Sequence, residues 1–263
     1  MRIGILSKRE GNFTGKLRLY LQSKGHEVRI YTLKNLKINQ ELLDNDFFIL
    51  KSKQLFFLYA GYFIESNNFP IYPSTEIAFK HKNRIEAHFL IKKAGFLSPN
   101  IYLGTKQVLT QNLTYSSRSY IQKPIMSSGS KGVGIVTKSD DIEAETDEII
   151  YLEDFISGIH YLAYFIKDNI FVYEKEPLAN EHAPVKEIEL TNDLKSLVIR
   201  WKNEYNLLFG HLDLVKEKNT DKIYIVDIGC FPEFSHWKNI IDAVNSVGNL
   251  ILNFYYKNSK RIN

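Results

Sequence analysis

The sequence predicts a mixed α/β (α+β) protein, in which an N-terminal α/β lobe with a parallel sheet precedes two regions of antiparallel sheet. Two observations carry this prediction. At the start of the chain, strand-length apolar runs alternate with helical patterns, which is typical of βαβ units. After about residue 99, short β-rich runs follow one another with small or acidic turns between them, which favours antiparallel strands. A length of 263 residues fits such a division into lobes.

Residues 1–75 are expected to form the N-terminal subdomain. β-Branched runs at 2–7 and 27–33 lie on either side of a short helical pattern, which makes a βαβ unit. The apolar run 46–51 indicates a third, fully buried strand. Residues 54–66 are then expected to form the next helix.

Residues 76–156 are expected to form a central subdomain. A helical periodicity extends from Ser74 to Lys93, and the region from Pro99 to Phe155 contains four strand-like runs, IYLG, SYIQKPI, GVGIVT and IIYLEDF. Their order and their turns predict an antiparallel sheet.

Residues 157–263 are expected to form a C-terminal subdomain. A hairpin is predicted about Asp168 and Asn169, followed by a helix over 190–206. The runs LFGHLDLVKE and KIYIVDIG are then expected to pair as strands, and residues 239–256 to form the last helix.

Composition excludes several functional classes. Lys and Arg total 34 against 30 Asp and Glu, a small positive excess that suits an anionic ligand but lacks the dense basic stretches of nucleic-acid-binding proteins. The single cysteine, Cys230, makes neither an intramolecular disulfide nor a cysteine zinc cluster. The most apolar run, 55–64, is about half the length of a membrane-spanning helix. We therefore expect a cytoplasmic protein with no nucleic-acid or membrane partner, and the oligomeric state stays open.

The most informative stretch is a loop of small residues that follows Lys123. Backbone N–H groups of such a loop approach polyphosphate oxygens closely, and its hydroxyls and lysine add donors. No helix follows it, so it is neither a P-loop nor a dinucleotide fingerprint. The alternative is a flexible hairpin turn. The candidate nucleotide-binding residues of the loop are Ser128, Gly129, Ser130, Lys131 and Gly132.

Two later strands each carry an aspartate. Asp213 and Asp227 lie on strands that a short turn at 219–221 would pair. Two carboxylates brought together near phosphates suit magnesium, which commonly takes one or two protein carboxylates plus phosphate oxygens. The alternative is that each is a strand-end aspartate in solvent.

Taken in order, these elements resemble the ATP-grasp superfamily over nearly the whole chain. The resemblance implies an N-terminal Rossmann-like subdomain and central and C-terminal subdomains that clamp ATP with Mg²⁺, or with Mn²⁺ in its place. It implies that Asp213 and Asp227 hold the metal. The implied nucleotide-binding residues are Arg84, Lys123, Ser128, Gly129, Ser130 and Gly132 for the phosphates, and the hinge Glu153, Asp154 and Phe155 for adenine.

Two branches of the superfamily are similar to different segments. The N-terminus and the GSKGVGIV loop resemble RimK-like carboxylate–amine ligases. DFFILK and VDIGCFPEF resemble the inositol-polyphosphate kinases, of the inositol-tetrakisphosphate kinase type. In both branches an asparagine metal ligand usually stands at the position of Gly229. The second resemblance implies that Lys51 and Lys175 act at a phosphate-rich acceptor. Lys53 and Lys131 are further lysines that could line such a pocket, with Lys131 as a candidate catalytic residue.

The distribution of arginine separates the two branches. Ligases of this type use arginines after the hinge to stabilise an acyl phosphate and its adduct, whereas this chain has none between Arg118 and Arg200. The main hypothesis is therefore an ATP- and Mg²⁺-dependent phosphotransferase acting on a hydroxyl of a phosphate-rich small molecule, such as an inositol polyphosphate. The alternatives are a RimK-like carboxylate–amine ligase and, because of Gly229, a nucleotide-binding protein with impaired catalysis.

Overall fold

The N-terminal region forms a parallel sheet in the computed structural model, which describes residues 1–126, 132–145, 147–179 and 183–259. The strand order is β2-β1-β3-β4, and the first three strands lie where the sequence predicts them. Every residue of β3 is buried, as expected for a strand covered on both faces. The elements are β1 (Arg2–Leu6), α1 (Asn12–Ser23), β2 (Glu27–Tyr31), η1 (Gln40–Asp44), β3 (Phe47–Leu50), α2 (Leu55–Ser66) and β4 (Ile71–Tyr72).

The central sheet is antiparallel, with the order β5-β8-β6-β7. A small hydrophobic cluster under this sheet includes Leu109, Tyr120 and Leu152. Leu109 belongs to a short helix that the strand pattern of the sequence did not predict. The elements are β5 (Ile101–Gly104), α5 (Lys106–Asn112), β6 (Tyr120–Lys123), β7 (Gly134–Val136), η2 (Ser139–Asp141) and β8 (Ile150–Asp154).

The C-terminal sheet is also antiparallel, with the order β11-β10-β9-β12-β13. One of its faces packs on α6 through Val198 and Trp201, which are fully buried. The predicted hairpin between β9 and β10 is present and turns at Lys167 and Asp168, one residue before the expected position. The elements are β9 (Gly158–Ile166), β10 (Asn169–Lys175), β11 (Val185–Ile188), α6 (Asn192–Glu204), β12 (Phe209–Glu217) and β13 (Ile223–Gly229).

The helical periodicity expected from Ser74 to Lys93 corresponds to two helices separated by a short turn. They are α3 (Thr75–Lys80) and α4 (Arg84–Lys93). The helix does not continue through Asn83. The Asn83 side chain accepts hydrogen bonds from the backbone N–H groups of Ile85 (3.0 Å) and Glu86 (3.3 Å) and so caps a new helix. The break places a short turn, residues 81–83, between the two helices.

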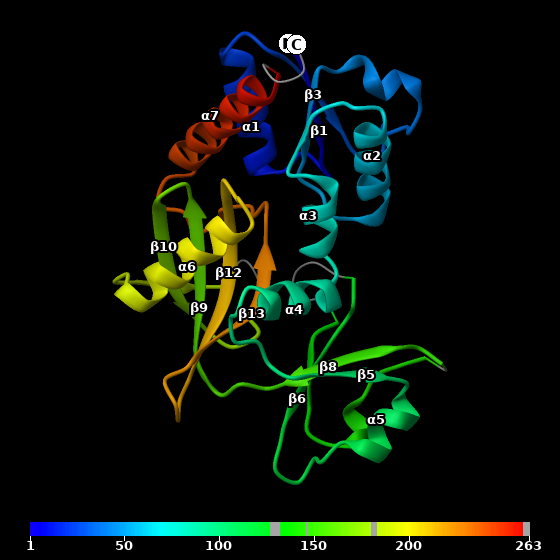
Figure 1. Cartoon of the computed structure of the whole chain (residues 1–263), viewed down its shortest axis with the longest axis vertical. Coiled ribbons are helices and arrows are strands. Elements are labelled where there is room, and N and C mark those ends of the chain that lie inside the picture. The colour runs from blue at the N-terminus through cyan, green and yellow to red at the C-terminus, as the bar shows by residue number, and fades with distance from the viewer. Residues whose placement is uncertain (127–131, 146, 180–182, 260–263) are drawn as a thin grey trace.

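The last helix, α7 (Ile240–Ser259), returns to the N-terminal region and lies beside α1 (Figure 1). The two helices approach closely at Gly248, where a Cβ atom would lie 2.5 Å from the Tyr20 ring. The Tyr20 hydroxyl also donates a hydrogen bond to Asn249 Oδ1 (2.6 Å). Hydrophobic residues of α1, α7, β1, β3 and the C-terminal sheet therefore share one core.

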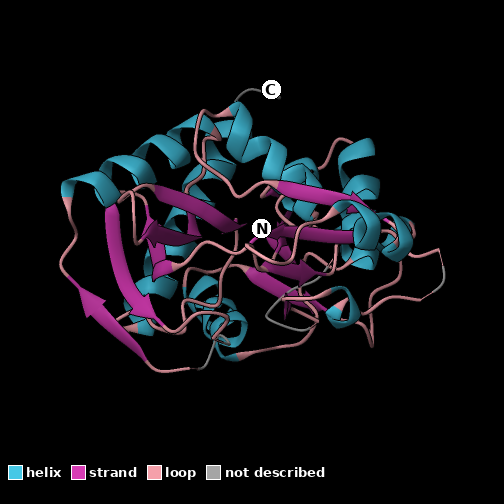
Figure 2. Cartoon of the chain, turned by 90° about the horizontal axis from the view of Figure 1, so that it is seen from below, coloured by secondary structure: helices cyan, strands magenta, loops and turns pink. Residues whose placement is uncertain are grey.

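Several of the helices lie on the outside of the strands (Figure 2). In the ranges that the structure describes, none of these helices combines the length and the apolar character needed to cross a bilayer.

Candidate functional site

Asp213 and Asp227 lie directly opposite each other on β12 and β13. Residues in register on neighbouring antiparallel strands point to the same face, with Cβ atoms about 5 Å apart. The pairing predicted from the short turn is therefore confirmed. Asp213 Oδ2 contacts Lys175 Nζ (3.1 Å), and its buried Oδ1 has no hydrogen-bond partner among the described residues.

Asp227 is surrounded by cations from three parts of the fold. Arg84 Nη1 lies 3.5 Å from Asp227 Oδ1, which also accepts the Ile228 N–H (3.0 Å). Burial by itself would raise the pKa of the Asp227 carboxyl, but Arg84, Lys123 and Lys53 outweigh it and hold the pKa below its usual value. The carboxylate therefore stays ionised.

Lys123 ends β6 and lies in a buried ion pair with Glu153 of β8. Its ammonium also donates to the Val226 carbonyl (3.1 Å), and the Tyr151 hydroxyl donates to Glu153 Oε2 (3.1 Å). Both charged side chains are less than a tenth exposed. Burial, and then the Glu153 carboxylate, raise the pKa of the Tyr151 hydroxyl, so it remains a proton donor. These contacts fix Lys123 beside the aspartates.

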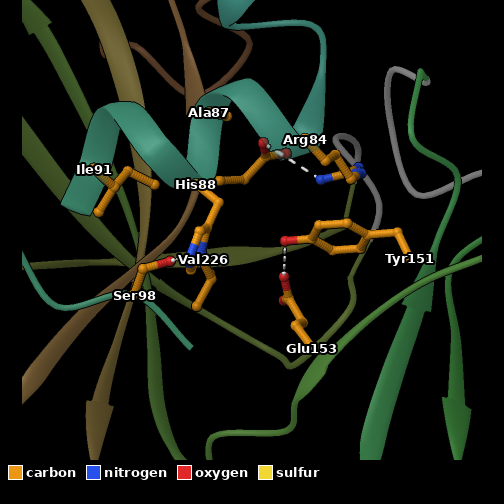
Figure 3. A pocket seen from close by; sticks show the side chains of 9 residues that line it. Arg84, Ala87, His88, Ile91, Ser98, Tyr151, Glu153 and Val226 are labelled. Atoms are coloured by element: carbon orange, nitrogen blue, oxygen red, sulfur yellow. Dashed lines mark hydrogen bonds and ion pairs between the residues drawn. The ribbon is translucent and has the colours of Figure 1, made fainter. Parts of the chain in front are cut away.

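The wall next to this ion pair is closed by α4. Figure 3 shows Arg84 and His88 on that helix above the hydrogen bond between Tyr151 and Glu153. His88 Nδ1 is hydrogen-bonded to the Ser98 hydroxyl (3.1 Å), and burial lowers the pKa of the His88 imidazole. The space that remains is about 10 Å³, which is no more than one water occupies, so this wall is packed.

Arg84 is held where α4 begins. Its Nε donates to the Pro124 carbonyl (3.1 Å), and its backbone N–H donates to the Ile125 carbonyl (3.0 Å). The start of α4 is thereby attached to the segment that leads into the stretch of small residues 127–134, which we call the glycine loop.

The structure describes the glycine loop from Gly132 onward. The φ of Gly132 is +68°, and a Cβ at this position would lie 2.8 Å from Pro124 Cγ, so only glycine fits. The other loop candidates, Ser128, Gly129, Ser130 and Lys131, lie outside the described residues.

The hinge candidates divide between two faces of β8. Glu153 points to Lys123, whereas the neighbouring Asp154 side chain accepts from Asn100 Nδ2 (2.8 Å) and the Tyr102 hydroxyl (3.1 Å). Adjacent residues of a strand face opposite sides, so the Asp154 carboxylate is directed away from the cluster. The Phe155 backbone N–H donates to the Ser119 carbonyl (2.9 Å), which anchors the end of the strand.

Lys51 lies at the end of β3 and pairs with a residue far along the chain. Its Nζ contacts Glu233 Oε1, and the ammonium lies 5.5 Å from the centre of the Phe231 ring. The Lys51 side chain is only 6% exposed. The sequence did not predict this pairing.

Sequence reasoning missed Lys82, in the turn between α3 and α4. Its side chain is buried, and burial, followed by the charges of Lys53 and Arg84, lowers its pKa to about 8. Lys53, which follows β3, donates only a long hydrogen bond, to the His81 carbonyl (3.5 Å), among the bonds described. The sequence offered one signal for Lys82 as a site residue, because it stands two residues before the candidate Arg84.

The position of Gly229 is filled by another residue. Gly229 is paired with His211 across β12 and β13, and a Cβ at 229 would lie 1.9 Å from His211 Cε1. The imidazole thus occupies the space of the missing side chain, and its buried Nδ1 has no hydrogen-bond partner in the described ranges. In those ranges, no three His, Cys, Asp or Glu side chains converge as a preformed metal site.

We predict that Gly229→Ala destabilises the fold by about 1–3 kcal/mol, because the new methyl group displaces the His211 ring. Urea unfolding measures this loss. Gly134→Ala is the matched control, since a Cβ at Gly134 meets nothing within 4 Å. Combining Gly229→Ala with His211→Ala should recover part of the stability; equal stability of Gly229→Ala and the wild-type chain would contradict the contact.

No family model and no curated protein matches the sequence. Solved structures do match. A RimK-domain ATP-grasp protein from Sphaerobacter thermophilus superposes with a TM-score of 0.78 at 12% identity, covering 96% of this chain and 100% of that one. The D-alanine–D-alanine ligase of Bacillus anthracis, in complex with ATP, gives 0.70 at 16% identity, covering 100% of both chains. A RiPP-associated ATP-grasp ligase of Chryseobacterium gregarium, with ADP and peptide, gives 0.69 at 14% identity and 96% coverage of both. The chain has the ATP-grasp fold.

Proposed function

We propose that this protein is an ATP- and Mg²⁺-dependent ligase that joins a carboxylate to an amine through an acyl phosphate. The observation that carries the proposal is the opposed pair Asp213 and Asp227, set among Arg84, Lys123 and Lys175. Paired carboxylates among cations suit a metal–polyphosphate complex. The named structures of the same fold are two ligases, crystallised with ATP or ADP, and a RimK-domain protein. The phosphotransferase hypothesis gains no support from them, and the ligase alternative accounts for them better.

The donor set fits magnesium. Asp213 Oδ1 is a buried carboxylate oxygen without a partner in the described residues, and it lies across from the ionised Asp227. Mg²⁺ usually binds through one or two carboxylates and completes its shell with water and phosphate oxygens. When bound, it would neutralise phosphate charge as the phosphoryl group moves. Asp213 and Asp227 are the residues that would hold it.

The protein groups would position the reactants. Lys123 and Arg84 would hold phosphates of ATP. The Lys123 ammonium and the Arg84 guanidinium are each held in place by a backbone carbonyl and a carboxylate. A carboxylate oxygen of the acid attacks the γ-phosphorus, and the bond to the β,γ-bridging oxygen breaks as ADP leaves with the electron pair. An amine nitrogen then attacks the acyl carbon, phosphate leaves, and the nitrogen loses a proton. The products are an amide, ADP and phosphate.

Hydroxylamine trapping tests the proposal. The protein is incubated with Mg·ATP, hydroxylamine and a panel of amino acids and other carboxylic acids, and hydroxamate and ADP are measured. We expect hydroxamate only when ATP and an accepted acid are both present.

The same assay, run with inositol polyphosphates, separates the second candidate function. The lysine-rich site and the lack of arginine between Arg118 and Arg200 favour this candidate, a phosphotransferase. ADP with a more phosphorylated inositol, and no hydroxamate with any acid, would reject the ligase. Tight binding of Mg·ATP without turnover on either panel would instead favour the nucleotide-binding protein that Gly229 suggested.

A further inference from the structure

Most cations around the aspartates are already paired. Lys175 contacts Asp213, Lys123 contacts Glu153, Lys51 contacts Glu233, and Arg84 contacts Asp227. These pairs balance charge within the fold.

Lys82 differs from them. It is 7% exposed, yet in the described part of the chain its ammonium has no ion pair and no hydrogen bond. Its charged neighbours are the cations Lys53, Arg84 and Lys8, and the carboxylate of Asp227. A buried lysine usually has a partner, because removing an ammonium from water is costly. An anion from outside the chain would provide that partner.

Lys53 and Lys82 approach the site from the side of the N-terminal sheet. Lys53 follows β3, and Lys82 lies in the turn before α4, where the Lys53 ammonium reaches the His81 carbonyl (3.5 Å). Lys123 instead ends β6 of the central sheet. Ligands of open α/β sheets bind at the carboxyl ends of the strands, which is where Lys53 lies. The two lysines are therefore placed to hold a second anionic group, apart from the residues proposed for ATP.

We propose that Lys53 and Lys82 form a second anion site beside Asp227, which binds the phosphoryl group of an acyl phosphate. The inference rests on the proposed ligase function. An acyl phosphate and its adduct carry oxyanions that need cationic donors, and the chain has no arginine between Arg118 and Arg200 to supply them. Lys53 and Lys82 supply those cationic donors instead.

The test uses inorganic phosphate as the probe, because phosphate is the anion left when the acyl phosphate reacts. Phosphate is titrated into the full chain with saturating Mg·ADP, and binding is followed by the shift in the unfolding temperature. We expect Lys82→Gln and Lys53→Gln each to weaken phosphate binding at least tenfold and to change ADP affinity less than threefold. Lys82→Arg should retain phosphate binding.

Lys80→Gln is the matched control. Lys80 ends α3 two residues before Lys82, but it pairs with Glu76 on the surface of the same helix. Its replacement should leave both phosphate and ADP binding unchanged.

The unfolding temperature without ligand gives a second measurement that a structural lysine would not reproduce. The pKa of Lys82 is about 8 in the folded chain and 10.5 in the unfolded one, so below pH 8 the charged ammonium of Lys82 destabilises the folded state. The penalty declines as pH rises from 8 to 10.5, because the folded state then gives up its proton first. Lys82→Gln should therefore raise the unfolding temperature at pH 7 and not at pH 10.5. A lower unfolding temperature at pH 7 would contradict an unpaired Lys82.

The outcomes separate the two proposals. If the wild-type chain does not bind Mg·ADP, the proposed function fails. If it binds Mg·ADP but not phosphate, or if Lys82→Gln and Lys53→Gln bind phosphate as the wild type does, the second anion site is rejected and the ligase proposal stands.

Discussion

Asp227→Asn is expected to lower ATP turnover by about 10³-fold, which corresponds to about 4 kcal/mol of activation free energy. The change keeps the shape of the side chain but removes the charge that faces Arg84 and the opposed Asp213. Metal binding would lose one of its two protein carboxylates. ADP formation with an accepted acid, measured in a coupled assay, gives the result.

Asp44→Asn is the control for this experiment. Asp44 is exposed at the end of the helical turn η1. It lies shortly before the start of β3, whereas Lys51 follows the end of that strand. The ATP turnover of the Asp44→Asn variant should equal that of the wild type. Turnover of Asp227→Asn within tenfold of the wild type, in a chain that unfolds at the wild-type temperature, would contradict the role of Asp227.

Lys123→Met is expected to destabilise the fold by about 3–5 kcal/mol, because it leaves the buried Glu153 carboxylate without its cation. Urea unfolding at pH 7 measures the loss. The change also removes the ammonium proposed to bind phosphates, so nucleotide affinity should fall together with stability.

A double variant separates the two effects. Lys123→Met with Glu153→Gln replaces the ion pair by two neutral side chains, and the amide oxygen of the new glutamine still accepts from the Tyr151 hydroxyl. Stability should recover by at least about 2 kcal/mol, whereas Mg·ATP affinity should stay low. Recovery of both would show that Lys123 acts only through stability; recovery of neither would contradict the unpaired charge as the cause.

The opposed pair of aspartates is the part of the candidate site that the sequence predicted best. Asp213 and Asp227 lie on strands joined by a short turn, so local rules alone bring them into register. Lys123 at the end of β6 and the break into the glycine loop followed from the same strand pattern.

Contacts between distant segments were not predictable in the same way. The partner of Lys51 is Glu233, from the loop after the last strand, 182 residues further along the chain. His211 fills the space at Gly229 only because β12 and β13 align there. Hydrophobic periodicity carries no information on such pairings.

The break between α3 and α4 has a local cause. The helical periodicity from Ser74 to Lys93 does not by itself show where the helix is interrupted. The capping bonds of Asn83 begin a new helix, which places Lys82 in the turn before α4 and Arg84 at its first position. Here a single capping residue decides where two site cations lie.

Binding of Mg·ATP at Asp213 and Asp227 underlies every step proposed for this site. Calorimetric titration of the wild-type chain with a non-hydrolysable ATP analogue, with Mg²⁺ and with EDTA, measures this directly. We predict one site per chain, at least tenfold tighter with Mg²⁺, with that magnesium dependence lost in Asp227→Asn. No binding, or binding that is equal in Mg²⁺ and EDTA and unchanged by Asp227→Asn, would contradict a metal–nucleotide site at the two aspartates.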